Sequence, residues 1–135
     1  MTNESRSSYS YSKSLAGQNF ESVLAKVITA LKTEGFGVLT EIDVAETLKK
    51  KLDVHFRRYK ILGACNPSLA HQALLQELLV GLFMPCNVIV FEDGDDIVVA
   101  IGKPEAMFQP IGNSEMGPLI QELDAKIARI LEQLT

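Results

Sequence analysis

The sequence predicts an α+β fold, in which a single mostly antiparallel sheet of about five strands carries helices on one face. Strand-like and helix-like segments intermix along the chain, and a strong hairpin signal, Asp93-Gly94 between two runs of high β propensity, argues against a purely parallel sheet. At 135 residues the chain has the length of one ordinary domain. We expect that domain to occupy residues 8–135, behind a polar tail at residues 1–7.

The first two predicted elements are a strand and a helix. Aromatic and basic residues alternate with serines over residues 9–14, as in a strand with one polar face. Asn19 is a good helix N-cap, and apolar residues over 20–31 follow at the spacing of a buried helical stripe. Gly35 suits the left-handed residue that ends such a helix.

The middle of the chain predicts two strands with a short helix between them. Residues 36–42 and 59–65 have the composition of strands. Between them an Asp-x-x-Glu start signal opens a helix over 43–52, whose apolar residues we expect to face inward. Asn66-Pro67 is a strong start for the next helix, because Asn caps well and Pro suits the first helical position.

The second half predicts a helix, a hairpin and a final helix. The helix that starts at Pro67 extends to about residue 79, and the hairpin pairs 86–91 with 97–101. Both faces of these strands are apolar, so we expect the hairpin to be central in the sheet or covered on its second face. A turn or a single helical turn at 104–108 precedes a last helix over 118–134.

Composition and charge exclude several functional classes. Acidic residues outnumber basic ones, 17 to 13, and the formal net charge of −4 disfavours binding to nucleic acid. No apolar run approaches the roughly 20 residues needed to span a bilayer, and the polar N-terminus lacks a secretory signal. Two cysteines are too few for a secreted disulfide scaffold. We therefore expect a soluble cytoplasmic protein without membrane or nucleic-acid partners.

Two cysteines and a histidine are the main candidates for chemistry. Cys65 ends a strand directly before a capped helix start, where unpaired backbone N–H groups favour a thiolate. His71 lies in that helix, and Cys86 begins the next strand. If the two strands are antiparallel neighbours, the sulfurs lie close together. Cys65, His71 and Cys86 then form a candidate site for a transition metal ion (zinc, copper or iron), or the two thiols form a reversible disulfide.

A simpler interpretation of the same residues is structural. Free cysteines often pack as small hydrophobes, and no Cys-x-x-Cys pair or fourth metal ligand is evident. Asn66 and Asn87, each beside a cysteine and near a proline, are candidate ligand-binding residues, or serve only as a cap and a turn. The sequence leaves both interpretations open.

Charged residues are segregated along the chain. Six basic residues within twelve positions form a candidate anion-binding patch, namely Lys49, Lys50, Lys51, Arg57, Arg58 and Lys60. Acidic residues cluster at the hairpin tip over 92–96, and this tip could dock on the basic patch of a second subunit. The alternative is that both segments are solvated loops that keep the protein soluble.

Two further apolar segments are candidates for lining a ligand pocket or a dimer seam. They are residues 81–84 and 107–108, which combine Met with Phe. No Ser-His-Asp constellation and no pair of carboxylates placed for acid–base work is evident, so the sequence favours a binding module over an enzyme.

A succession of short motifs over about residues 19–134 resembles a known family. The motifs are Gly35-Phe36-Gly37, Thr47-Leu48, Lys51-Leu52, Tyr59-Lys60-Ile61-Leu62-Gly63-Ala64-Cys65-Asn66-Pro67, Ala70-His71, Ala73-Leu74, Gly81, Met84-Pro85-Cys86-Asn87-Val88, Val90 and Glu92. This order resembles the uncharacterised family called domain of unknown function 302. The Gly-Ala-Cys-Asn-Pro and Pro-Cys-Asn segments are its most specific part, and Met84 stands where Leu is more often expected.

The resemblance implies a compact α+β fold related to the TATA-binding-protein-like group, a homodimer, and no established activity. The characteristic positions of the family map to Cys65, Asn66, Pro67, His71, Pro85, Cys86 and Asn87. We therefore predict a binding or sensing module whose Cys/His site serves a metal, a small ligand or thiol redox chemistry. This site lies between the 59–65 strand, the 67–79 helix and the 85–91 strand. The alternative is a non-catalytic homodimerisation module in which the Cys-Asn motifs only shape turns.

Overall fold

A computed structural model describes residues 2–6 and 8–135, with side chains from Ser8 onward. The strands are β1 (Thr2–Arg6), β2 (Ser10–Ala16), β3 (Gly37–Asp43), β4 (Tyr59–Cys65), β5 (Cys86–Asp93) and β6 (Asp96–Gly102). The α-helices are α1 (Phe20–Thr33), α2 (Val44–Leu52), α3 (Pro67–Gln76), α4 (Pro104–Phe108) and α5 (Gly117–Glu132). Short 3-10 segments follow α3 at Leu78–Phe83 and α4 at Gln109–Ile111 and Ser114–Met116.

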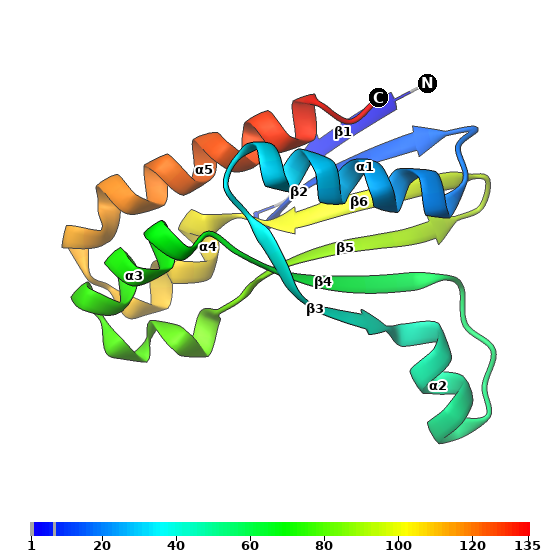
Figure 1. Ribbon diagram of the computed structural model, residues 1–135, viewed down its shortest axis with the longest axis horizontal. Coiled ribbons are helices and arrows are strands. Elements are labelled where there is room, and N and C mark those ends of the chain that lie inside the picture. Colours follow the sequence, from blue (N-terminus) through cyan, green and yellow to red (C-terminus); the bar gives the residue numbers. More distant parts are fainter. Residues whose placement is uncertain (1, 7) are drawn as a thin grey trace.

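The strands form one antiparallel sheet in the order β1-β2-β6-β5-β4-β3, with the long helices on one face (Figure 1). This arrangement confirms the α+β class, with six strands against the five expected. The hairpin strands β5 and β6 occupy the centre, as their apolar character on both faces predicts. None of the helices in the described residues has the length and apolar character needed to cross a membrane.

The edge strand β1 lies in the stretch that the sequence suggests is a polar tail. Residues 2–6 pair with β2 in antiparallel register, from Thr2 opposite Leu15 to Arg6 opposite Tyr11. This strand is defined by main-chain pairing with an available sheet edge. The sequence therefore has no alternation of hydrophobic residues that would predict it. Residues 1 and 7 of the expected tail lie outside the described residues.

Three asparagine and aspartate caps begin helices where the sequence predicts them. The side chain of Asn19 accepts a hydrogen bond from Ser22 N at 2.7 Å, and Asp43 accepts one from Glu46 N at 2.9 Å. Asn66 caps α3 by the same means. Gly35 ends the first helical segment with a φ of 84°, in the left-handed region that favours glycine. These caps fix where the chain turns between strand and helix.

The core lies between the sheet and the two long helices, α1 and α5. Alternate strand residues point into it, including Leu62, Val88, Val90, Val99 and Ile101, all of which are buried. The intervening residues lie on the opposite side of the sheet, which we call the open face, and neither of the long helices α1 and α5 covers them (Figure 1). Burial on one face only is the usual state of an antiparallel sheet with helices on one side.

A buried lysine anchors the end of α5 to the sheet. Lys13 in β2 is 8% exposed, and its ammonium donates a hydrogen bond of 2.9 Å to the carbonyl oxygen of Leu131. This carbonyl lies in the last turn of α5, where the helix carries partial negative charge. The contact therefore satisfies the buried cation with a carbonyl that also accepts a hydrogen bond from Leu134 N at 3.1 Å.

The helix α2 does not turn its apolar residues into the core, contrary to the expectation from its pattern. None of its residues is buried, and Leu52 at its end is 66% exposed. Figure 1 shows α2 extending away from the rest of the molecule beyond the end of β3. Ion pairs one turn apart, Lys49 with Asp53 and Lys50 with Glu46, support it on its solvent side.

Gly63 in β4 allows two neighbouring segments to approach each other closely. A Cβ at this position would lie 2.8 Å from Pro85 Cγ and would overlap Thr40 Oγ1. Gly37 in the adjacent strand pairs with Cys65 and has open space around it. A Cβ at Gly37 would meet nothing within 4 Å. Glycine is therefore needed at residue 63 to seat Pro85 beside β4.

We predict that Gly63→Ala destabilises the protein by about 1–3 kcal/mol in urea unfolding, because its methyl group overpacks against Thr40 and Pro85. Gly37→Ala is the matched control and is expected to change the free energy of unfolding by less than about 1 kcal/mol. Adding Thr40→Ala to Gly63→Ala should recover part of the loss. Equal effects of the two glycine substitutions would contradict this explanation.

Candidate functional site

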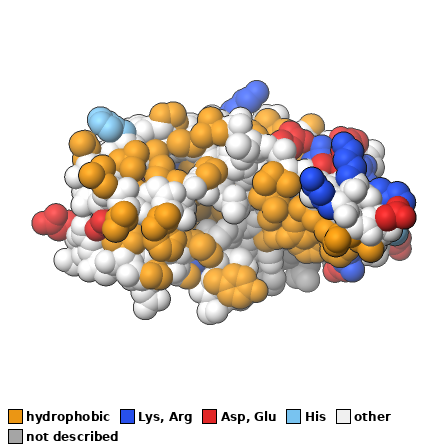
Figure 2. Space-filling view, turned by 90° about the horizontal axis from the view of Figure 1, so that it is seen from below, with side chains coloured by type: hydrophobic (Ala, Val, Ile, Leu, Met, Phe, Trp, Pro, Cys, Tyr) orange, Lys and Arg blue, Asp and Glu red, His pale blue; other side chains and the backbone are white. Residues whose placement is uncertain are grey.

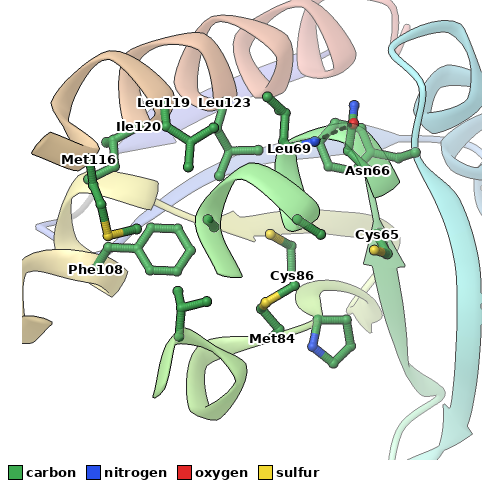
Figure 3. Close-up of a pocket in the computed structure, with 16 residues that line it drawn as sticks. Cys65, Asn66, Leu69, Met84, Cys86, Phe108, Met116, Leu119, Ile120 and Leu123 are labelled. Carbon is green, nitrogen blue, oxygen red and sulfur yellow. Dashed lines mark hydrogen bonds between the residues drawn. The ribbon is translucent and has the colours of Figure 1, made fainter. Parts of the chain in front are cut away.

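A small apolar cavity lies where β4, α3 and β5 meet, and α4 and α5 close it (Figure 3). Its volume is about 40 Å³. That volume is enough for a few atoms of a ligand or one to three water molecules. Cys65 and Cys86 lie in its wall, together with Leu69, Met84 and Phe108. The structure therefore places a cavity in the region that the sequence proposes as a site.

The register of the sheet brings the two cysteines to the same end of the sheet but turns their side chains to opposite faces. Cys86 begins β5 opposite Ala64, and Cys65 is the next residue of β4. Each strand therefore contributes a cysteine at the same end of the sheet. Met84 comes two residues before Cys86, and both residues line the cavity.

Asn66 is fully engaged in structural hydrogen bonds beside this cavity. Its side-chain oxygen accepts from Leu69 N at 3.2 Å, and its Nδ2 donates to the Glu34 carbonyl at 3.1 Å. A Cβ at Gly35 would lie 3.0 Å from that Nδ2. Asn66 therefore caps α3 and joins it to the end of α1. This use fits the structural interpretation of the residue better than direct ligand binding.

The thiol of Cys86 lies in surroundings that favour its neutral form. Burial, with a smaller contribution from the nearby Cys65, raises the pKa of Cys86 to about 11. Both cysteines are free and half-buried. Cys86 is therefore a protonated, apolar wall residue at neutral pH.

The predicted trio of Cys65, His71 and Cys86 is not brought together. His71 is exposed on α3 and does not line the cavity. The helix turns Leu69 and Ala73 inward, so residue 71 points to solvent. Among residues 8–135, no group of three or more His, Cys, Asp or Glu side chains is placed to hold a metal ion.

A larger groove of about 450 Å³ adjoins the cavity on the side of the open face. The two share five wall residues, namely Met84, Pro85, Cys86, Phe108 and Leu123. Asn87 lines the groove and is exposed, and Tyr9 and Ser10 contribute further polar groups. The apolar segments 81–84 and 107–108 also lie along it, as expected for a ligand pocket.

The basic patch is largely neutralised within the chain. Five of its six residues have a carboxylate partner: Lys49 with Asp53, Lys50 with Glu46, Arg57 with Asp93, Arg58 with Glu21 and Lys60 with Glu41. The acidic hairpin tip thus pairs with the basic segment of its own chain. This pairing leaves little positive field for an anionic ligand.

Comparison with known proteins places the chain in a family. A family model described as Domain of unknown function DUF302 matches residues 11–134. The chain belongs to the DUF302 family. A solved structure described as an uncharacterized conserved DUF302 protein from Bacillus stearothermophilus is 25% identical to it, with a TM-score of 0.88. That similarity covers 96% of this chain and 100% of the other, and no curated protein matches.

The DUF302 relationship confirms the family predicted from the sequence motifs and agrees with the fold, and it supplies no activity. The sequence analysis named the cysteines and, within the segment 81–84, Met84 as candidates for lining a pocket, but it missed Met116 in the same wall. Nothing local identifies Met116, which reaches the cavity from the 3-10 turn before α5.

The raised pKa of Cys86 makes a prediction for alkaline pH. A thiol whose pKa is higher in the folded state stabilises the fold fully below its unfolded pKa, and this contribution is lost as pH rises through the folded pKa. Between about pH 8 and pH 10.5 the wild type should lose about 2 kcal/mol more stability than Cys86→Ala. Chemical denaturation at both pH values measures the difference. Parallel losses in the two proteins would show that Cys86 is not held neutral.

Proposed function

We propose that this DUF302 protein is a binding module that takes a small, mostly apolar ligand into the cavity and the adjoining groove. The observation that carries the proposal is the continuity of the two spaces across Met84, Cys86 and Phe108. The cavity accepts the apolar end of a ligand, and the groove offers Asn87 to a polar end. Apolar walls with a few polar groups are typical of small-molecule sites.

Three observations favour this ligand class over the other classes that the sequence suggests. Cys86 is held as a neutral thiol, so this residue does not act as an activated nucleophile. The histidine needed for a mixed Cys/His metal site lies exposed on α3. An uncharged ligand also fits a site whose neighbouring basic residues are paired with carboxylates.

The test is ligand-dependent stabilisation. Straight-chain primary alcohols of increasing length should raise the melting temperature of the wild type, because a ligand that binds only the folded state stabilises it by mass action. Ala70→Leu fills part of the cavity wall and should reduce this rise. Ala125→Leu places the same substitution on the exposed side of α5 and should leave the rise unchanged.

The proposal fails if no alcohol raises the melting temperature of the wild type. It also fails if the alcohols raise the melting temperature of the cavity variant Ala70→Leu as much as they raise that of the wild type and of the control Ala125→Leu. Each variant is compared with its own ligand-free melting temperature, so a change in basal stability does not affect the conclusion.

A second candidate function, homodimerisation, is favoured by the open face of the sheet. Ile61, Ile89 and Phe91 are only half-buried there, and Ile42 beside them is 48% exposed. Figure 2 shows hydrophobic side chains gathered on this side, next to the charged end of the molecule.

We infer that two chains pack sheet against sheet through this face. A stable interface buries roughly 800 Å² on each partner. Such an interface would cover Ile42, Ile61 and Ile89 on both chains.

Light scattering after size exclusion should give twice the chain mass for the wild type. Ile61→Lys places a charge in the middle of the open face and should shift the protein to monomer. Leu78→Lys, on a residue that is 82% exposed outside this face, is the control and should leave the dimer intact. A wild type that is monomeric at all concentrations, or dissociation by Leu78→Lys alone, would contradict the assignment.

Three expectations from the sequence remain predictions. They are the cytoplasmic location, the absence of nucleic-acid partners and the relationship to the TATA-binding-protein-like group. A net charge of −4 and the pairing of the basic segment support the second of these.

A further inference from the structure

The floor of the groove is part of the open face of the sheet. In β5 and β6 the buried core residues alternate with residues that point to the opposite side, and Asn87, Ile89 and Ala100 are among the latter. All three line the groove. Met107 of α4 lies on the same side, because a Cβ at Gly102 would be 3.0 Å from its Cε. The candidate ligand site and the candidate dimer surface therefore share residues.

The groove is open to solvent along its rim. Two residues of its lining are largely exposed, Leu82 at 81% and Tyr9 at 63%. Asn87 on its floor is exposed as well. Small-molecule sites usually bury about 70–90% of the surface of their ligand. In a single chain, a ligand that fills this groove therefore keeps one side in contact with water.

The open face has the charge pattern that suits contact with a copy of itself. A symmetric interface places the same patch of both subunits against each other, so a patch with charges of one sign repels its copy. The register of the strands aligns five residues in one row across this face, and none of them is charged. They are Ser12, Ala100, Ile89, Ile61 and Ile42. A second copy can therefore approach this row without electrostatic repulsion.

We propose that the open face of a second copy covers the ligand in the groove, so that ligand binding and dimerisation strengthen each other. This inference deepens the proposed function and rests on it, because it adds a further wall and a form of regulation to the same site. A ligand between the two sheets contacts both chains and holds them together. By thermodynamic linkage, the dimer then binds the ligand more tightly than the monomer by the same factor.

The chemistry of the ligand determines the sign of this coupling. The face that covers the groove is apolar around Ile61 and Ile89, so covering an apolar ligand removes further apolar surface from water. A charged ligand would lose its hydration on being covered and would weaken the dimer instead. An uncharged, mostly apolar ligand therefore stabilises the dimer.

The first measurement is the dissociation constant of the wild-type dimer by sedimentation equilibrium, with and without hexanol. Hexanol should lower this constant at least about fivefold, the lower end of the usual range for coupled sites. Ala70→Leu fills part of the cavity wall, so hexanol should leave its constant within about twofold. This control accounts for any general effect of hexanol on apolar interfaces. A wild-type constant that hexanol leaves unchanged or raises overturns the coupling.

The second measurement is the rise in melting temperature that hexanol causes. Ile61 is not among the described residues that line the cavity or the groove. Ile61→Lys, which is expected to be monomeric, should nevertheless lose at least about half of the wild-type rise. Leu78→Lys, which is expected to leave the dimer intact, should keep the full rise. Wild-type protein diluted below the dissociation constant of its dimer should lose the same share as Ile61→Lys, and this comparison needs no substitution.

The outcomes separate this inference from the proposals on which it rests. If hexanol raises the melting temperature of Ile61→Lys and of the diluted wild type as much as that of the wild-type dimer, each chain binds its ligand alone. The shared wall is then overturned, and the ligand site stands. If hexanol has no effect on the wild type, the ligand site itself fails and this inference fails with it. A wild type that is monomeric at all concentrations overturns the shared wall and leaves the ligand site standing.

Discussion

The helix α5 packs across the sheet through a continuous apolar stripe, and the positions of both the core and the cavity depend on this contact. Its C-terminal half buries Ile127, Ile130 and Leu131 against the strands, and Lys13 holds its last turn. Its N-terminal half brings Leu119 and Leu123 to the cavity wall. The same helix therefore closes the hydrophobic core at one end of the sheet and the candidate site at the other.

The site that results has low polarity and little net charge, and the surface around the basic segment is also neutralised. Cys86 stays protonated because burial disfavours its thiolate. The side chain of Asn66 forms its hydrogen bonds with the start of α3 and the end of α1. These properties agree with a site that holds ligands by apolar contact. They do not resemble the opposed acid and base of a hydrolytic centre.

Local signals in the sequence were sufficient for most of the fold, because caps, turns and apolar spacing act over a few residues. Asn19, Asp43 and Asn66 begin their helices as predicted. The errors concern packing at a distance: the edge strand β1 depends on pairing with β2, and α2 projects where its pattern suggested burial. The same contrast between local signals and distant packing applies to the residues of the candidate site. The cysteines were found from their motifs, whereas the exposure of His71 depended on which side of α3 meets the core.

Between β3 and β4 the chain leaves the sheet, forms the projecting helix α2 and returns through residues 53–58 before the next strand. The two strands are antiparallel neighbours, so a tight turn would suffice to connect them. With no buried residue in α2, this excursion can open locally while the sheet stays intact. It is therefore the natural place in the chain to accept an inserted peptide or a change of loop length without loss of the fold.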